Sequence, residues 1–191
     1  DRWKTLQASD WTFQVDYSHR ENNKGYMYDE RVRPSTRLNY MKKTDAKEEI
    51  PGKSRQAVEN IYEYCRKNNA KLVLISTPST AYWNYKRHNS VAELAESLGV
   101  EYVDMNLIND QVGIEWSTDT RDRGMHMNIY GARKCSAFLG AYLAKTEQFQ
   151  DKRKDASYAD WFDALEAFNE STDNALDRPS PEPEDNTKKA D

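Results

Sequence analysis

Apolar residues gather in the middle of this chain, between about residues 57 and 143, while both ends are polar. Within that middle part, stretches with apolar positions at i, i+3, i+4 and i+7 predict amphipathic helices. A short, continuously apolar run predicts a strand buried on both faces, and a second short strand follows. The predicted order is helix 53–69, strand 72–75, helix 89–98 ending at Gly99, strand 102–105 and helix 129–145.

Helices that alternate with strands across short connections are typical of a parallel sheet with crossover helices. We therefore predict an α/β fold. Two strands are too few for a doubly wound sheet, which needs about five, and they leave hydrogen-bonding edges that a stable fold pairs or covers. Either the chain is the C-terminal part of a longer protein, which we favour, or a partner chain completes its sheet.

The two ends have different patterns. Residues 1–50 predict a polar N-terminal arm of the same domain, with strand-like alternation only at 11–17. The α/β domain is expected to span 51–169, where 158–168 adds one more helix lying on the body. Acidic residues, proline and serine dominate 170–191, and this composition predicts a disordered tail.

Composition narrows the classes of function. Charged residues make up 31% of the chain and the net charge is −4. An acidic balance argues against a nucleic-acid binder, which needs a basic surface. No run is long and apolar enough for a membrane span, so we expect a soluble chain that reaches a membrane only through an N-terminal anchor absent from it.

Neither a metal nor a cofactor is expected. Cys65 and Cys135 fall on inward helical positions and are predicted to be buried. A zinc site would need clustered ligands. The tripeptide Gly52-Lys53-Ser54 lacks the earlier glycine of a phosphate-binding loop.

Candidate chemistry lies in the loops after the two strands, because ligands in open α/β sheets bind at the carboxyl ends of strands. The loop 106–127 carries His126 just before a helix that Asn128 is expected to cap. A catalytic base needs an acceptor on its second ring nitrogen. Asp122, four residues earlier, can fold back onto His126, and Asp119 is the alternative. A surface or capping histidine remains the other interpretation of this position.

The loop after the first strand, 76–88, offers fewer signals. Ser79 follows a strand, as nucleophiles often do, but Pro78 and the lack of a Gly-x-Ser-x-Gly turn argue against that role. The aromatic ring of Trp83 suits a sugar face, although covering the core edge explains it equally well. Ser79, Trp83 and Asn128 are therefore candidates for the rim of a substrate site, and His88 is expected at the surface.

The segment Asp122-Arg-Gly-Met-His126-Met-Asn128, running on to Leu143, resembles the last sequence block of the SGNH/GDSL hydrolase superfamily. The similarity is greatest to its extracytoplasmic, membrane-anchored branch, which is related to cell-surface polysaccharide O-acyltransferases. It covers residues 53–145 and includes Thr77-Pro78-Ser79, Trp83 and Asp104-Met-Asn106. The resemblance implies a flavodoxin-like three-layer α/β/α sandwich and a catalytic pair formed by His126 and Asp122.

The same resemblance implies a function with a missing part. The parent protein would be a serine esterase or O-acyltransferase acting on acylated carbohydrate at the cell surface. Two departures matter: the family spacing Asp-x-x-His is one residue shorter than Asp122–His126, and the serine turn Gly-Asp-Ser is absent. We therefore expect the nucleophile in a missing N-terminal segment and little activity from this chain alone. The alternatives are a non-catalytic module that binds glycan or a partner, and an assembly subunit with open sheet edges.

Overall fold

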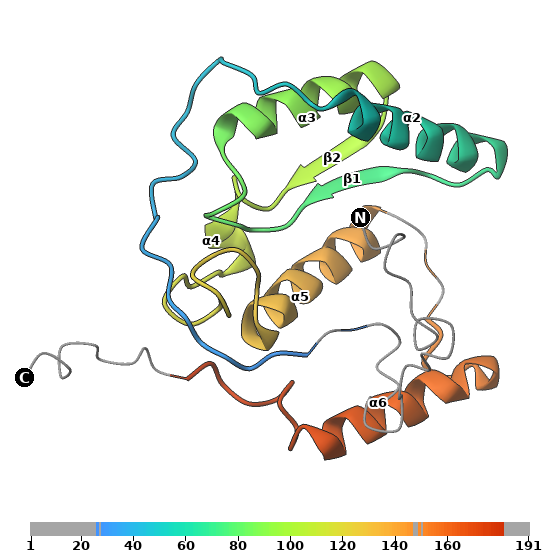
Figure 1. Cartoon of the computed structure of the whole chain (residues 1–191). Helices are drawn as coiled ribbons and strands as arrows, with labels where there is room; N and C mark the ends of the chain where they lie inside the picture. Colours follow the sequence, from blue (N-terminus) through green and yellow to red (C-terminus); the bar gives the residue numbers. More distant parts are fainter. Residues whose placement is uncertain (1–25, 27, 147–148, 150, 182–191) are drawn as a thin grey trace, which may run out of the picture. The chain divides into compact units, whose positions relative to one another are not determined.

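The computed structural model describes residues 26, 28–146, 149 and 151–181 (Figure 1). The chain divides into two compact units, one made of 1–27 with 151–177 and the other of 28–150 with 178–191. The sequence analysis placed 51–169 in a single domain, whereas the structure assigns 151–177 to a unit of its own. Among the described residues, no helix has the length and apolar character that a membrane span requires.

The larger unit contains a small parallel sheet. Strand β1, Val73–Ser76, pairs with β2, Glu101–Asp104, so that Val73 faces Glu101 and Ser76 faces Asp104. In Figure 1, α2 and α3 lie on one side of this strand pair and α5 lies on the other. The predicted parallel α/β arrangement is confirmed at this coarse level. The prediction that the first strand is buried on both faces is wrong, because Ile75 is 39% exposed.

Helix α2 spans Gly52–Lys67 and agrees closely with the predicted 53–69. It begins after Pro51 and ends with two basic residues, which suit the negative end of a helix. None of its residues is buried, and Ile61 on the predicted inward stripe is 52% exposed. Periodicity therefore predicts the helix correctly but overestimates how much of it is covered.

Helix α3, Tyr85–Leu98, begins four residues before the predicted 89–98. The side chain of Asn84 accepts a hydrogen bond from the Arg87 amide, and this is the N-cap that the apolar pattern did not reveal. Gly99 ends the helix as predicted, with a φ of 64° that favours glycine.

The core of this unit lies between β2 and α5, Ile129–Thr146. Met105, Val112 and Cys135 are buried together, and side chains of α5 pack against them. Val112 belongs to a short helix, α4 (Asn109–Val112), which the sequence analysis did not predict. Burial raises the pKa of the Cys135 thiol to about 11. Cys65 is only half-buried, so the prediction of two buried cysteines holds for Cys135 alone.

The smaller unit contains a 3₁₀ turn, η2 (Ala156–Tyr158), and helix α6 (Ala159–Ser171). Within it, Phe168 is buried and its ring contacts that of Tyr26 edge-on at 6.0 Å. The helix predicted over 158–168 is confirmed. The disordered tail predicted from residue 170 is not found at 170–175, because α6 continues to Ser171 and Ala175 is fully buried. The possible strand at 11–17 and the end of the tail at 182–191 lie outside the described residues.

Candidate functional site

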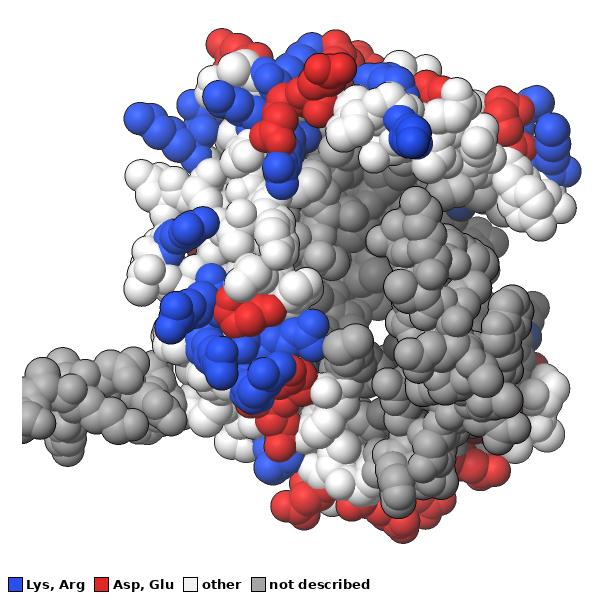
Figure 2. All heavy atoms as spheres, in the orientation of Figure 1, with Lys and Arg blue, Asp and Glu red and all other residues white. Residues whose placement is uncertain are grey.

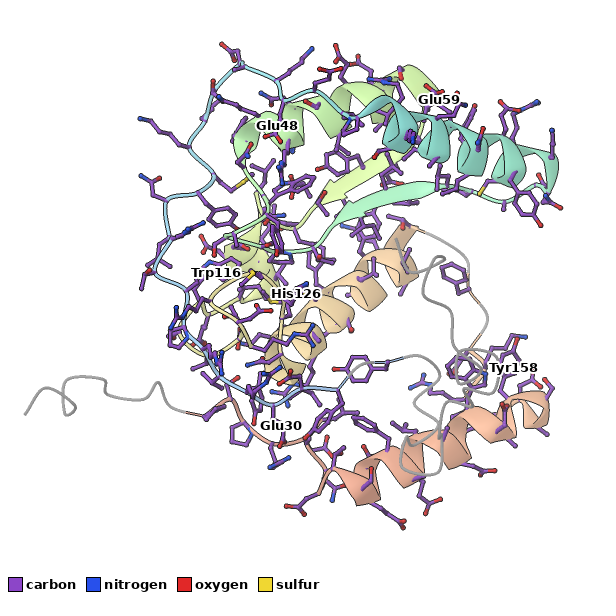
Figure 3. All side chains as sticks on the ribbon, in the orientation of Figure 1. Glu30, Glu48, Glu59, Trp116, His126 and Tyr158 are labelled. Carbon is purple, nitrogen blue, oxygen red and sulfur yellow. The ribbon has the colours of Figure 1, made fainter. Side chains whose placement is uncertain are left out.

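The loop that carries His126 is a closed turn held at its base. Thr120 and Met127 form an antiparallel bridge, and the Arg121 amide donates to the His126 carbonyl. At its tip, Gly124 has a φ of 91°, and a Cβ there would lie 1.9 Å from Thr80 Oγ1. Only glycine fits this close approach. The loop is therefore seated tightly on the segment that follows β1, and His126 lies beside the carboxyl end of the sheet (Figure 3).

Asp122 holds His126 by two contacts. Its Oδ2 lies 2.5 Å from His126 Nδ1, and its Oδ1 accepts the His126 backbone amide at 2.7 Å. With the carboxylate as acceptor, Nδ1 carries the hydrogen and Nε2 is the basic nitrogen. Among the described residues, Nε2 has no hydrogen-bond partner, and the His126 side chain is 53% exposed.

The pKa of Asp122 lies below its usual value. Partial burial acts to raise this pKa, but the hydrogen bonds from the His126 side chain and backbone amide outweigh the burial and lower it. The carboxylate therefore stays ionised at neutral pH, as an orienting group must.

Asp119, the alternative carboxylate, is used elsewhere. It is fully buried, and its Oδ2 lies 2.7 Å from Lys134 Nζ of α5 and 2.8 Å from the Glu115 amide. The longer spacing between Asp122 and His126 thus still brings them together, whereas Asp119 fixes the loop to α5.

Asn128 has the predicted capping role and no place at a substrate rim. Its Oδ1 accepts the amides of Tyr130 and Gly131, which satisfies the first turn of α5. Its Nδ2 donates to the Thr118 carbonyl, and only 1% of the residue is exposed. A side chain so enclosed does not reach a ligand, so Asn128 does not belong to the substrate rim at which the sequence placed it.

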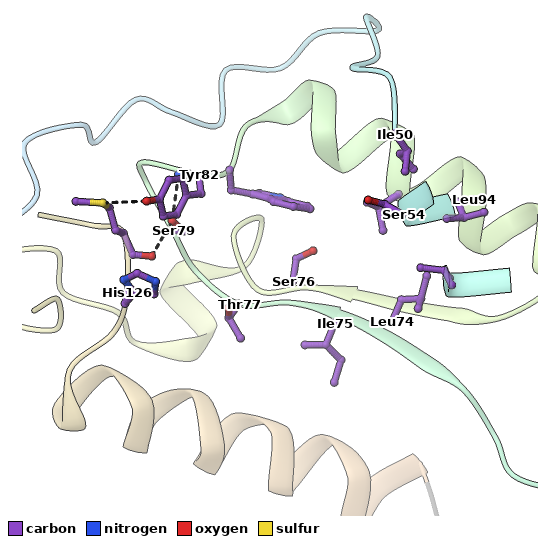
Figure 4. A pocket seen from close by; sticks show the side chains of 14 residues that line it. Ile50, Ser54, Leu74, Ile75, Ser76, Thr77, Ser79, Tyr82, Leu94 and His126 are labelled. Carbon is purple, nitrogen blue, oxygen red and sulfur yellow. Dashed lines mark hydrogen bonds between the residues drawn. The ribbon is translucent and has the colours of Figure 1, made fainter. Parts of the chain in front are cut away.

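His126 borders a pocket of about 500 Å³ that follows β1. Figure 4 shows His126, Ser79 and Tyr82 at one end of this pocket and Leu74 and Leu94 at the other. The ring of Tyr82 contacts that of His126 edge-on at 6.0 Å. The histidine thus lies at the end of the pocket that holds Ser79 and Tyr82.

None of the described hydroxyl groups around this pocket is hydrogen-bonded to the His126 ring. Ser79 Oγ, the nearest candidate by sequence, donates to the carbonyls of Gly124 and Met125 and accepts the Tyr82 amide. Ser76 Oγ is bonded to the Tyr102 hydroxyl instead. Ser79 therefore lines the predicted rim, but its contacts tie two loops together and do not make it a nucleophile.

A second histidine–aspartate pair lies outside the lining of this pocket, next to Trp83, which lines it. His88 Nδ1 lies 2.8 Å from Oδ2 of Asp104, whose side chain is 2% exposed. The indole of Trp83 and the hydroxyl of Tyr102 also donate to this oxygen, at 2.9 and 3.0 Å. Oδ1 accepts both the amide and the side-chain nitrogen of Asn106.

The prediction that His88 lies at the surface is wrong, because its side chain is 17% exposed and its ring stacks on that of Tyr102. A sequence signal did exist: Asp104 ends the second strand and His88 follows the first, at the same edge of the sheet. Trp83 borders the pocket, and Asp104 fixes its orientation.

Within the described part of the chain, no three side chains of His, Cys, Asp or Glu are grouped so as to hold a metal ion.

Comparisons with protein-family models, with curated proteins and with solved structures found no match to this chain.

Proposed function

We propose that this chain supplies the general base and its orienting carboxylate to a serine-dependent site that cleaves or transfers acyl esters of carbohydrate. The observation on which this proposal rests is the geometry of His126. Its Nδ1 is held by Asp122, its Nε2 has no hydrogen-bond partner among the described residues, and the residue lines a pocket. In such a site the histidine takes the proton of the attacking serine and returns it to the leaving alcohol.

The nucleophile in this proposal comes from outside the described residues, because no described hydroxyl is bonded to the His126 ring. Among the described residues β1 pairs only with β2, and the edge that this leaves open also fits the proposal. A parent fold with a flavodoxin-like three-layer sandwich would continue the sheet there and bring a further strand end next to His126. From the resemblance of the 122–143 block, we infer that such a parent protein acts outside the cytoplasmic membrane.

The test uses the protein encoded by the complete reading frame. A fluorophosphonate probe should label one serine, which peptide mass spectrometry then locates, and the protein should hydrolyse p-nitrophenyl acetate. His126→Ala should lower both labelling and turnover by about 10² to 10⁴-fold, with unchanged urea unfolding. Ser97→Ala, which changes an exposed serine of α3 outside the pocket, is the control and should keep both. A His126→Ala protein that is labelled at the normal rate, or a label on Ser79, would contradict the proposal.

A glycan-binding module without catalysis is the second candidate. The observation in its favour is that no described hydroxyl reaches His126 Nε2. This candidate predicts no fluorophosphonate labelling, together with carbohydrate binding that survives His126→Ala and is lost on Trp83→Ala. The labelling and the binding measurements together show whether His126 acts as a base or only supports the structure.

A further inference from the structure

Three exposed arginines surround the loop of His126. The segment 28–37 runs beside this loop, and the Arg123 amide donates to the Arg33 carbonyl at 3.1 Å. The Arg33 amide in turn donates to the Thr120 carbonyl. Arg33 and Arg123 are therefore neighbours held by the backbone, and Arg123 lies three residues before His126. Figure 2 shows a group of basic side chains over this part of the molecule.

The third arginine is placed by Ser35. Ser35 Oγ lies 2.5 Å from Thr80 Oγ1, one residue after Ser79 at the pocket mouth, and it also accepts the Arg37 amide. We call Arg33, Arg37 and Arg123 the arginine strip. Its members come from two segments that are both anchored to the walls of the site.

Charge pairing separates the strip from its neighbours. Arg31 is bonded to Asp29 through two guanidinium nitrogens, and Arg121 lies 3.6 Å from the same carboxylate. Within the described residues, Arg33, Arg37 and Arg123 have no ion pair, and all three are exposed. The nearby carboxylate of Asp122 is held by His126. Three guanidinium groups without an ion pair among the described residues thus lie on two neighbouring segments of a chain whose net charge is −4.

We infer that the arginine strip binds the anionic groups of an acidic polysaccharide and so presents that polymer to His126. Guanidinium groups bind carboxylate and sulfate oxygens in pairs of hydrogen bonds, and a polymer with a charge on successive sugars would meet several of them. Tyr82, 53% exposed beside His126, offers an aromatic face to a sugar ring. The acidic net charge disfavours nucleic acid. This inference rests on the proposed function for the role of His126, but the binding itself does not need catalysis.

The test measures binding to the chain as it stands, by calorimetry at low salt, with polygalacturonate, dextran sulfate and neutral dextran. Polygalacturonate or dextran sulfate should bind and dextran should not, and the better of the two identifies the anionic group. The double change Arg33→Gln with Arg123→Gln should weaken binding at least about tenfold. Lys53→Gln with Lys67→Gln, two exposed lysines at the ends of α2, removes the same charge elsewhere and should leave binding unchanged.

Each contrary outcome overturns the inference. If the lysine double change weakened polysaccharide binding equally, the binding would be general charge attraction without a site. Equal binding of neutral dextran would exclude recognition of charge. Tighter binding of duplex DNA would assign the strip to nucleic acid. His126→Ala should keep the polysaccharide affinity. If binding follows the strip while His126→Ala leaves the esterase activity of the complete protein unchanged, the strip stands and the proposed function fails.

Discussion

The chain holds two histidine–aspartate pairs, one at the lining of the pocket and one behind Trp83, and they differ in almost everything except their Nδ1 contact. In the pair His126–Asp122, the histidine is 53% exposed and its carboxylate has few other partners. In the pair His88–Asp104, the carboxylate is 2% exposed and accepts hydrogen bonds from Trp83, Tyr102 and Asn106 as well.

A histidine–aspartate contact therefore does not by itself identify a base. A base needs a free second nitrogen and access to substrate, and only His126 combines these with a pocket mouth. Asp104 instead satisfies several donors that would be costly to leave unpaired in a buried place. The buried pair therefore fixes the position of Trp83, and the exposed pair is available for chemistry.

The largest effect that separates the two pairs is expected in stability. Asp104→Ala leaves the donors of His88, Trp83 and Tyr102 without an acceptor and should lower the free energy of unfolding by about 2–4 kcal/mol. Asp122→Ala removes a contact near the surface and should lower it by less than about 1 kcal/mol. Urea unfolding followed by circular dichroism measures both.

Asp104→Asn serves as the control for this comparison. It keeps one acceptor oxygen and the side-chain volume, so its loss should fall between those of the two alanine variants. Equal destabilisation by Asp104→Ala and Asp122→Ala would show that the two pairs do not differ in structural role.

A smaller effect is expected in chemical reactivity. Diethyl pyrocarbonate modifies the unprotonated ring nitrogen of accessible histidines. The His126 side chain is 53% exposed and that of His88 17%, so His126 should react at least about threefold faster in the folded protein. Peptide mass spectrometry after short exposure measures the two rates. Equal rates in the folded protein would remove the basis for treating only His126 as open to substrate, and unfolding in urea should equalise them.

The sequence predicted the elements better than their surroundings. Helical periodicity placed α2 and α5 within a few residues, because the i, i+3, i+4 pattern is a property of each segment alone. The exposure of Ile61 and Ile75 was not predictable in that way, since burial depends on which neighbours cover a face. The start of α3 was missed because it is set by the single side-chain cap of Asn84.

The site was predicted in part for a similar reason. Asp122 and His126 are four residues apart in one tight turn, so a local argument could bring them together. His88 and Asp104 are sixteen residues apart along the chain, and their contact depends on how α3 packs against β2. The capping of α5 by Asn128 was predicted from its position, but its complete burial was not, because the Thr118 carbonyl that holds it comes from a distant turn of the loop.

The smallest effect concerns acid pH and the His126–Asp122 pair. The pKa of Asp122 is lowered in the folded protein, since the hydrogen bonds from His126 outweigh partial burial. A lowered folded pKa stabilises the protein above the ordinary aspartate pKa of about 4, and this stabilisation is lost as the pH falls through the folded value.

The difference in unfolding free energy between the native protein and Asp122→Asn should therefore be steady at pH 5 and above and narrow below about pH 4. Urea titrations of both proteins across this range measure it, and using the difference cancels the other carboxylates, such as Asp29, whose pKa is also lowered. A difference that widens toward acid pH would mean that Asp122 is not held as an ionised partner, and the orienting role assigned to it would fail.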